Sequence, residues 1–131
     1  MGKECASVVL DAALQYLENH VNWISVCETV PWTYEHAHSN KGTGSGLALA
    51  HSVTPTFTGP VAGDAGTYSR KTTVDEEAAM TVDVSGDADH VALVDTTATI
   101  LLYVTTCTQQ SLTAGNTVTA PAWDIEIGAP T

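Results

Sequence analysis

The hydrophobic pattern begins with a helical period. Apolar residues recur three or four positions apart between Leu10 and Val21, which places them on one face of a helix. Ser7 is a residue type that caps helices, and Asp11 follows early enough to interact favourably with the helix dipole. We therefore predict one amphipathic helix over about residues 7–20, whose apolar face must pack on a sheet or on another subunit.

After Asn22 the pattern becomes that of a β protein. Thr and Val are abundant, and Gly or Pro interrupts the chain every several residues. Residues 40–46 predict a flexible loop by composition, and 54–66 a turn-rich segment. Residues 32–39 are expected to be extended. The predicted strands are 23–30, which Pro31 ends, 47–53, 68–74, 80–84, 90–95, 99–107, 117–119 and 122–127.

The distribution of apolar residues within these strands predicts how they assemble. Strands 80–84 and 122–127 alternate apolar with polar residues, so each has one buried and one wet face. Ile100–Val104 is apolar on both faces and predicts a central strand. Short turns at 85–89 and 95–98 predict an antiparallel meander over about residues 80–107.

The fold class predicted is therefore mainly β, an antiparallel β-sandwich or barrel with one N-terminal α-helix packed on it. The core is expected to draw apolar residues from the helix and from several strands. These are Leu10, Leu14, Leu17, Val82, Leu102, Trp123, Ile125 and Ile127.

Length and charge narrow the class of protein. At 131 residues we expect a single domain, residues 1–131. Four Lys and Arg against 15 Asp and Glu give a formal net charge of −11, which disfavours a nucleic-acid partner because few phosphates could be neutralised. No segment has the roughly 18 consecutive apolar residues of a membrane span. The first residues lack a signal-peptide pattern, so we expect synthesis in the cytoplasm and no membrane partner.

The cysteines do not suggest a metal centre. Cys5, Cys27 and Cys107 are far apart, and none lies in a CxxC motif, so a zinc site is unsupported. We expect buried or half-buried thiols. A disulfide between Cys27 and Cys107, formed in an oxidising medium, is the alternative.

Histidines provide a first candidate for chemistry. In an extended segment, His36 and His38 would point to the same side, where two ring nitrogens could bind a transition metal. Two ligands do not make a site, and only the fold could add His20, His51 or His90. A solvated loop is the favoured interpretation.

Two further patterns favour ordinary turns. Asp83, Asp87 and Asp89 lack the spacing of an EF-hand, so an acidic hairpin turn is favoured over a calcium site. Gly42–Gly46 is rich in glycine like a phosphate loop. However, Lys41 precedes the glycines and a strand is expected to follow, so a flexible connector is favoured.

No pattern of nucleophilic catalysis is visible. There is no GxSxG motif, and a Cys–His pair would depend on chance proximity in the fold. We therefore expect no enzyme activity, no cofactor and no metal. Contact with a partner is expected instead from an aromatic segment after Pro31 and from the Gly-rich loop, at Trp32, Tyr34, Lys41 and Gly44.

Most of the chain resembles small virion proteins of tailed bacteriophages. The similarity includes the helical opening followed by Ile24–Glu28, and it does not extend clearly to about residues 34–66. From Ser69 onward it lies in Ser69–Val74, Ser85–Asp95, Leu101–Cys107, Leu112–Val118 and Pro121–Ile127.

The resemblance implies a virion structural protein. The expected role is a capsid cement or decoration protein on the capsid surface, a homo-oligomer that binds between subunits of the major capsid protein. The alternative within the virion is a tail, neck, or spike or fibre component. A secreted binding module is disfavoured, because a signal peptide is not evident.

Overall fold

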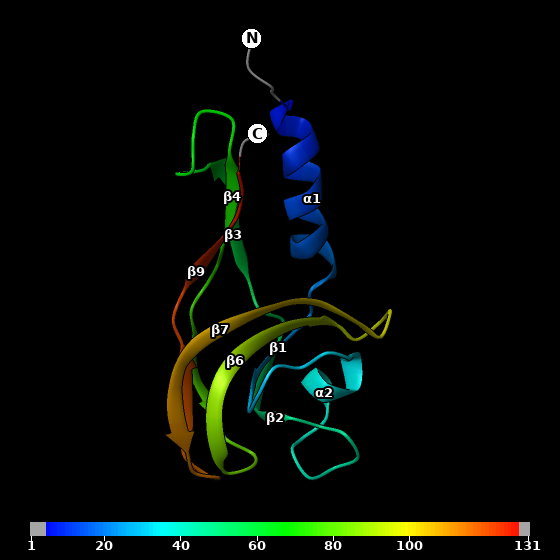
Figure 1. Ribbon diagram of the computed structural model, residues 1–131, viewed down its shortest axis with the longest axis vertical. Coiled ribbons are helices and arrows are strands. Elements are labelled where there is room, and N and C mark those ends of the chain that lie inside the picture. The colour runs from blue at the N-terminus through cyan, green and yellow to red at the C-terminus, as the bar shows by residue number, and fades with distance from the viewer. Residues whose placement is uncertain (1–4, 129–131) are drawn as a thin grey trace. The chain divides into compact units, whose positions relative to one another are not determined.

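The computed structural model describes residues 5–128, which form a mainly β structure with an N-terminal helix and antiparallel sheets (Figure 1). The predicted fold class is thereby confirmed. Contacts divide the described residues into two compact units. Unit 1 comprises residues 5–19, 56–76 and 121–128, and unit 2 comprises 20–55 and 77–120. Neither unit is one continuous segment of sequence, and the single-domain expectation stays a prediction.

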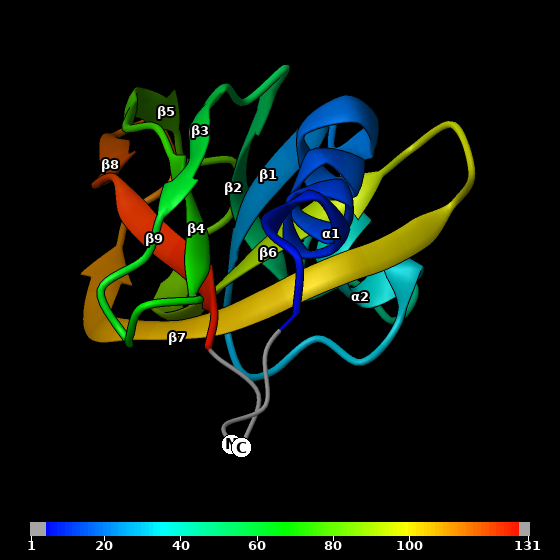
Figure 2. The ribbon, with the colours of Figure 1, turned by 90° about the horizontal axis from the view of Figure 1, so that it is seen from above.

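Unit 1 contains the first helix and a three-stranded antiparallel sheet (Figure 2). The helix contacts the central strand, β4, through polar side chains. The Arg70 guanidinium donates two hydrogen bonds to Asp11, of 2.7 and 3.1 Å, and Thr72 Oγ1 donates one of 2.7 Å to Glu18 Oε1. The elements are α1 (Ser7–His20), β3 (Phe57–Ala62), β4 (Arg70–Val74) and β9 (Trp123–Ile127), with sheet order β3-β4-β9.

Helix α1 has the predicted bounds, but its first turn differs from the expectation. Ser7 is the first helical residue and therefore not the N-cap, and the first turn contains no acidic residue. Asp11 lies beyond that turn, so its carboxylate binds Arg70 instead of the free N–H groups of the helix start.

Unit 2 contains a four-stranded antiparallel sheet and a separate two-stranded pair. Figure 1 shows β6 and β7 as two long curved neighbours. The four-stranded sheet has the order β2-β1-β6-β7, and β5 pairs with β8. The elements are β1 (Trp23–Cys27), α2 (Tyr34–His38), β2 (Ala48–Val53), β5 (Glu77–Thr81), β6 (Gly86–Asp95), β7 (Ile100–Leu112) and β8 (Thr117–Ala120).

The predicted central strand is wrong, because β7 lies at an edge of its sheet and β6 lies inside it. Burial agrees: Val91–Asp95 of β6 is buried throughout, whereas Ile100 of β7 is 44% exposed. The run of apolar residues in β7 has another cause. Leu101 and Val104 pack against the core cluster that contains Ala37.

The predicted meander is half right. β6 and β7 form the expected hairpin, whose turn is held by Asp95 Oδ1 as it accepts hydrogen bonds from the N–H groups of Thr97 and Ala98. β5 pairs with β8 instead of β6. The reason is that residues 86–89 belong to β6 and cannot form the preceding hairpin turn.

Two local structures were not predicted. Residues 34–38 are helical instead of extended, because Thr33 caps α2: its Oγ1 accepts a hydrogen bond of 3.2 Å from the N–H of His36. Strand β3 lies inside the segment predicted as turns. Gly59, at a φ of +127°, and Pro60 lie in a bulge of this edge strand, where a missing N–H is tolerated.

The Gly-rich loop at 40–46 is closed by backbone hydrogen bonds. Lys41 N–H donates to Ala48 O at 2.8 Å, and Gly46 N–H donates to Thr43 O at 3.0 Å. A side chain at Gly46 would collide with the Ser39 carbonyl, so this position requires glycine.

The predicted core residues differ in burial. Leu14, Val82 and Ile125 are buried, at 1%, 1% and 7% exposed. The remaining five are half-buried: Leu10, Leu17, Leu102, Trp123 and Ile127. Among the described residues, no helix is long and apolar enough to cross a membrane.

Candidate interaction surface

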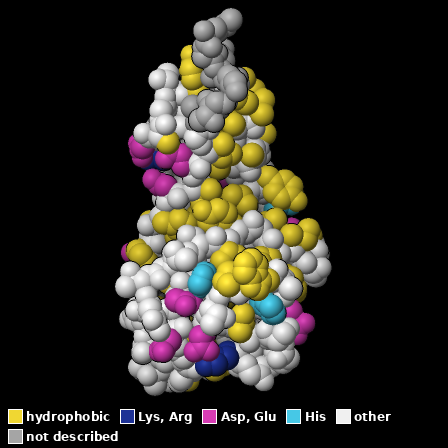
Figure 3. Space-filling model, viewed as in Figure 1, with side chains coloured by type: hydrophobic (Ala, Val, Ile, Leu, Met, Phe, Trp, Pro, Cys, Tyr) yellow, Lys and Arg dark blue, Asp and Glu magenta, His cyan; other side chains and the backbone are white. Residues whose placement is uncertain are grey.

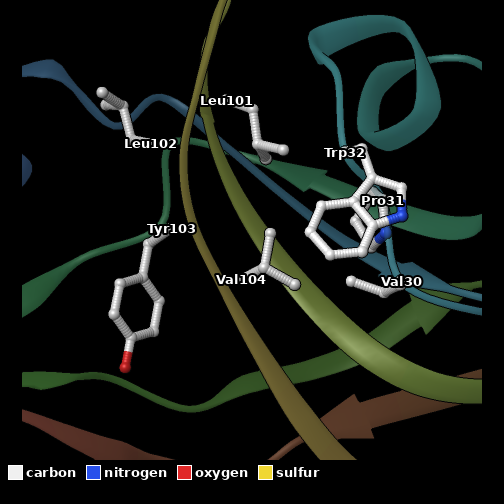
Figure 4. A pocket seen from close by; sticks show the side chains of 7 residues that line it. All are labelled: Val30, Pro31, Trp32, Leu101, Leu102, Tyr103 and Val104. Atoms are coloured by element: carbon white, nitrogen blue, oxygen red, sulfur yellow. The ribbon is translucent and has the colours of Figure 1, made fainter.

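An apolar groove of about 230 Å³ lies in unit 2, between the segment that follows β1 and the first part of β7. In Figure 4, Leu101 and Val104 lie on the side of β7 that faces Trp32, and Leu102 and Tyr103 lie on the other side. The full lining is Val30, Pro31, Trp32, Leu101, Leu102, Tyr103 and Val104. The lining therefore carries no charged side chain.

Trp32 is the most exposed large hydrophobic residue among those described, at 76%. Its backbone is nevertheless held in place, because its N–H donates a hydrogen bond of 3.1 Å to His36 Nδ1 in α2. The neighbouring Pro31 is buried. The backbone of Trp32 is therefore anchored, while its indole side chain is exposed to solvent.

The turn before the groove contains a strained residue. Thr29 has a φ of +63°, in the left-handed region that β-branched residues avoid. Its N–H donates a hydrogen bond of 2.8 Å to Asp89 Oδ1 on β6. This contact holds the chain where it leaves β1 and leads into Val30 and Trp32.

A stack of aromatic rings connects α2 to the sheet. Tyr34 stacks on His38 with ring centroids 4.9 Å apart, and His38 lies 4.5 Å from Trp23. Trp23 in turn stacks on His51 at 4.1 Å with an interplanar angle of 4°. The stack fixes the orientation of α2, and through it that of the groove wall.

The histidines do not converge on a metal. His36 and His38 lie on a helix, so the interpretation that both point to one side of a strand is wrong. His51 Nδ1 is 3.0 Å from Asp83 Oδ2, and His90 Nδ1 is 2.7 Å from Asp89 Oδ1. Within residues 5–128 no three His, Cys, Asp or Glu side chains gather in a way that could hold a metal ion.

The three acidic residues of the predicted turn make separate contacts. Asp83 contacts His51, and Asp87 Oδ1 accepts a hydrogen bond of 2.6 Å from Ser111. Asp89 accepts from Thr29 and contacts His90. Each carboxylate therefore has a local structural partner.

The other predicted contact residues lie around α2 and the loop that follows it. Tyr34 is half-buried in the ring stack, and Gly44 is exposed with a φ of +56°. Lys41 forms an ion pair with Glu28 at 2.7 Å. The hydrogen bond from Lys41, with a second from the Asp87 backbone, lowers the pKa of Glu28.

All three cysteines are free in the described structure. Cys27 is fully buried, and burial raises the pKa of its thiol to about 11, while Cys107 is exposed. Strand β6 separates β1 from β7. Two strand spacings amount to about 9.6 Å, more than the roughly 7 Å between Cα atoms that a disulfide can bridge. The alternative of a Cys27–Cys107 disulfide is therefore incompatible with this sheet.

Sequence reasoning identified Trp32 but not the groove beside it. The groove forms because β7 lies next to the segment that follows β1. These two segments are about 70 residues apart in the sequence, and local patterns do not encode such long-range contacts. The available signal was the apolar run Ile100–Val104, which predicts a central strand but belongs to the edge strand β7. No family model, curated protein or solved structure matches this chain.

Proposed function

We propose that this chain is a structural protein of a tailed bacteriophage virion, a capsid cement protein that binds between subunits of the major capsid protein. The observation that carries the proposal is the 76% exposed Trp32 beside an apolar groove. The sequence resemblance to small phage virion proteins supplies the class of partner.

The groove has the composition of a protein-binding surface. A tryptophan next to aliphatic side chains is the type of anchor that dominates binding energy in protein interfaces. In Figure 3, hydrophobic side chains are exposed over the part of unit 2 where α2 and the β6–β7 pair lie, with acidic side chains nearby. An apolar centre with a polar surround is typical of an interface.

The charge favours the outer surface of a capsid. With a net charge of −11 the chain repels DNA, so a position beside the packaged genome is unfavourable. An exterior position places the carboxylates in water and leaves the apolar groove to contact the capsid subunits.

A capsid-binding experiment tests whether Trp32 anchors the protein to the capsid. Particles assembled without this protein are incubated with wild-type chain, with Trp32→Ala, or with Tyr68→Ala, and the bound fraction is measured by sedimentation. Tyr68 is the matched control, because it is an aromatic residue exposed to 46% in unit 1. We expect Trp32→Ala to weaken binding by about tenfold or more, as hot-spot truncations do, and Tyr68→Ala to bind like wild type.

Particle stability tests the cement role itself. Phage particles that lack this protein should release DNA at a lower temperature than complete particles, and added wild-type chain should restore the difference. An unchanged release temperature would contradict cementing. A copy number far below that of the major capsid protein, measured by quantitative mass spectrometry, would favour the tail, neck or spike alternative.

A further inference from the structure

The apolar groove beside Trp32 has the size and lining of a site for a protein side chain. Its volume is about 230 Å³, below the roughly 300–1,000 Å³ of pockets that hold drug-sized ligands. In Figure 4, Leu101 and Val104 lie on one side of the groove and the indole ring of Trp32 on the other. Because the lining carries no charged side chain, a charge buried there would lose its hydration without an ionic partner. The groove therefore suits an aliphatic or aromatic side chain.

Acidic residues border the segment that carries Trp32. Glu28 lies four residues before Trp32, and Glu35 lies three residues after it, on α2. Between them, the N–H of Thr29 donates a hydrogen bond of 2.8 Å to Asp89 on β6. Figure 3 shows acidic side chains near the exposed hydrophobic side chains of this region. Glu28, Glu35 and Asp89 together are called the acidic rim below.

The protein's own cations do not neutralise this rim. Unit 2 contains seven Asp and Glu residues but a single Lys or Arg, Lys41, which is already bound to Glu28 at 2.7 Å. Arg70 and Lys71 of unit 1 are bound to carboxylates as well. Glu35 is exposed and takes part in none of the ion pairs found within residues 5–128. Charge complementarity therefore indicates a basic partner segment.

We propose that the groove receives an apolar side chain flanked by Lys or Arg on a segment of the partner, whose assignment to the major capsid protein rests on the proposed function. The apolar side chain lies between the indole of Trp32 and strand β7 and displaces water there. The flanking cations face the acidic rim, where they accelerate the encounter and select against acidic partners. A second copy of this chain fits less well, because its net charge of −11 brings mainly carboxylates to the rim.

A peptide titration tests the ligand chemistry on the full chain without a capsid. Three capped peptides serve as probes: Lys-Lys-Leu-Lys-Lys, Glu-Glu-Leu-Glu-Glu, and Lys-Lys-Ser-Lys-Lys, which lacks the apolar side chain. The reporter is the indole N–H signal of Trp32 in two-dimensional NMR spectra, identified by its absence from Trp32→Phe. We expect a saturable shift with the first peptide only. Raising the ionic strength from about 0.1 M to about 1 M should weaken this binding, because the Debye length falls from about 10 Å to about 3 Å.

Charge variants test whether the acidic rim binds the flanking lysines. Glu35→Gln should weaken binding of the first peptide by about two- to fivefold, as the loss of an exposed ion pair does. Glu35→Lys should weaken it further, because like charges then face each other. Glu76→Lys is the matched control, since it makes the same change of net charge at an exposed position of unit 1, and it should bind like wild type. Thermal melting verifies that each variant is folded, and the salt dependence of the wild-type chain needs no variant.

Capsid binding by the same variants separates this proposal from the proposed function. Capsid binding that is weakened by Trp32→Ala but unaffected by Glu35→Lys and by salt would retain the capsid partner and overturn the basic ligand. Binding of the first peptide without binding to capsids would support the ligand and contradict the capsid role. Equal shifts with the first peptide and either of the others, no shift with any peptide, or a dimer of the chain alone that Trp32→Ala dissociates would each overturn the proposal.

Discussion

The backbone N–H of Thr29 donates a hydrogen bond of 2.8 Å to Oδ1 of Asp89, which lies 60 residues later on strand β6. The contact joins the turn after β1 to the neighbouring strand and precedes the segment that carries Trp32. It therefore couples the position of the exposed indole to the pairing of β1 with β6.

Removal of this acceptor should destabilise the protein. We expect Asp89→Ala to lower the free energy of unfolding by about 1–2 kcal/mol, because the Thr29 N–H loses a charge-assisted hydrogen bond. Urea denaturation measures the change. Glu76→Ala is the control for loss of one carboxylate from an exposed position. Equal effects of both substitutions would show that the Thr29 contact contributes nothing specific.

The backbone strain at Thr29 predicts a stabilising substitution. Asn tolerates the left-handed conformation better than a β-branched residue, so Thr29→Asn should raise the free energy of unfolding by about 0.5–1 kcal/mol. Thr33→Asn is a comparison without strain relief. Thr33 is an extended N-cap with a φ of −132°, so asparagine has no left-handed strain to relieve at this position. A decrease in stability for Thr29→Asn would indicate that the threonine side chain makes a contact that outweighs the strain.

Local patterns predicted the long elements well. The apolar stripe from Leu10 to Val21 specified α1, because a helical period over three turns has few alternatives. Most strands were predicted from abundant Thr and Val between Gly and Pro breaks, and two of them, 80–84 and 122–127, also from alternation. α2 was missed because its five residues are too few for a periodic signal, and its stability comes from the Thr33 cap and from the tilted ring contact between His38 and Trp23.

The edge position of β7 could not be predicted from its own residues. Leu101 and Val104 are apolar because they cover the core beside Ala37 and line the groove. A central strand would show the same composition, so only the pairing partners distinguish the two cases. Trp32 was identified because a large aromatic residue next to a strand-ending proline tends to lie outside the sheet.

The contact between Arg70 and Asp11 attaches α1 to its sheet, so its loss should destabilise the protein. Arg70 binds both carboxylate oxygens of Asp11, and these two hydrogen bonds raise the pKa of the guanidinium. Asp11→Asn should lower the melting temperature by a few degrees, because one neutral amide cannot replace both charged contacts. Glu76→Gln is the control for loss of a negative charge from an exposed residue of unit 1. Differential scanning calorimetry measures both, and equal shifts would argue against an anchoring role.

The ion pair between Lys41 and Glu28 predicts a loss of stability in acid. The contact lowers the pKa of Glu28 below its ordinary value of 4.5, so the folded state binds its proton less readily than the unfolded state does. The stabilising contribution is therefore complete above the unfolded pKa and is lost as the pH falls through the lower folded pKa. Melting temperatures between neutral pH and pH about 3 should fall less steeply for Lys41→Met than for wild type. Identical pH profiles would contradict a coupling between these two residues.

The two thiols of the four-stranded sheet should react very differently. Cys27 is fully buried with a pKa of about 11, so near neutral pH it is protonated and inaccessible, whereas Cys107 is exposed. In Cys5→Ser, a thiol reagent should modify Cys107 rapidly and Cys27 only after denaturant is added.

Because burial raises the pKa of Cys27 above its ordinary value of 9.0, the unfolded state loses the proton first as the pH rises. Its contribution to stability is therefore complete below pH 9 and is lost as the pH rises from 9 to about 11. Cys27→Ala should abolish that part of the alkaline decline, although the lost packing also lowers its stability at neutral pH. Rapid labelling of Cys27 in the native protein would show that the sheet opens readily between β1 and β6.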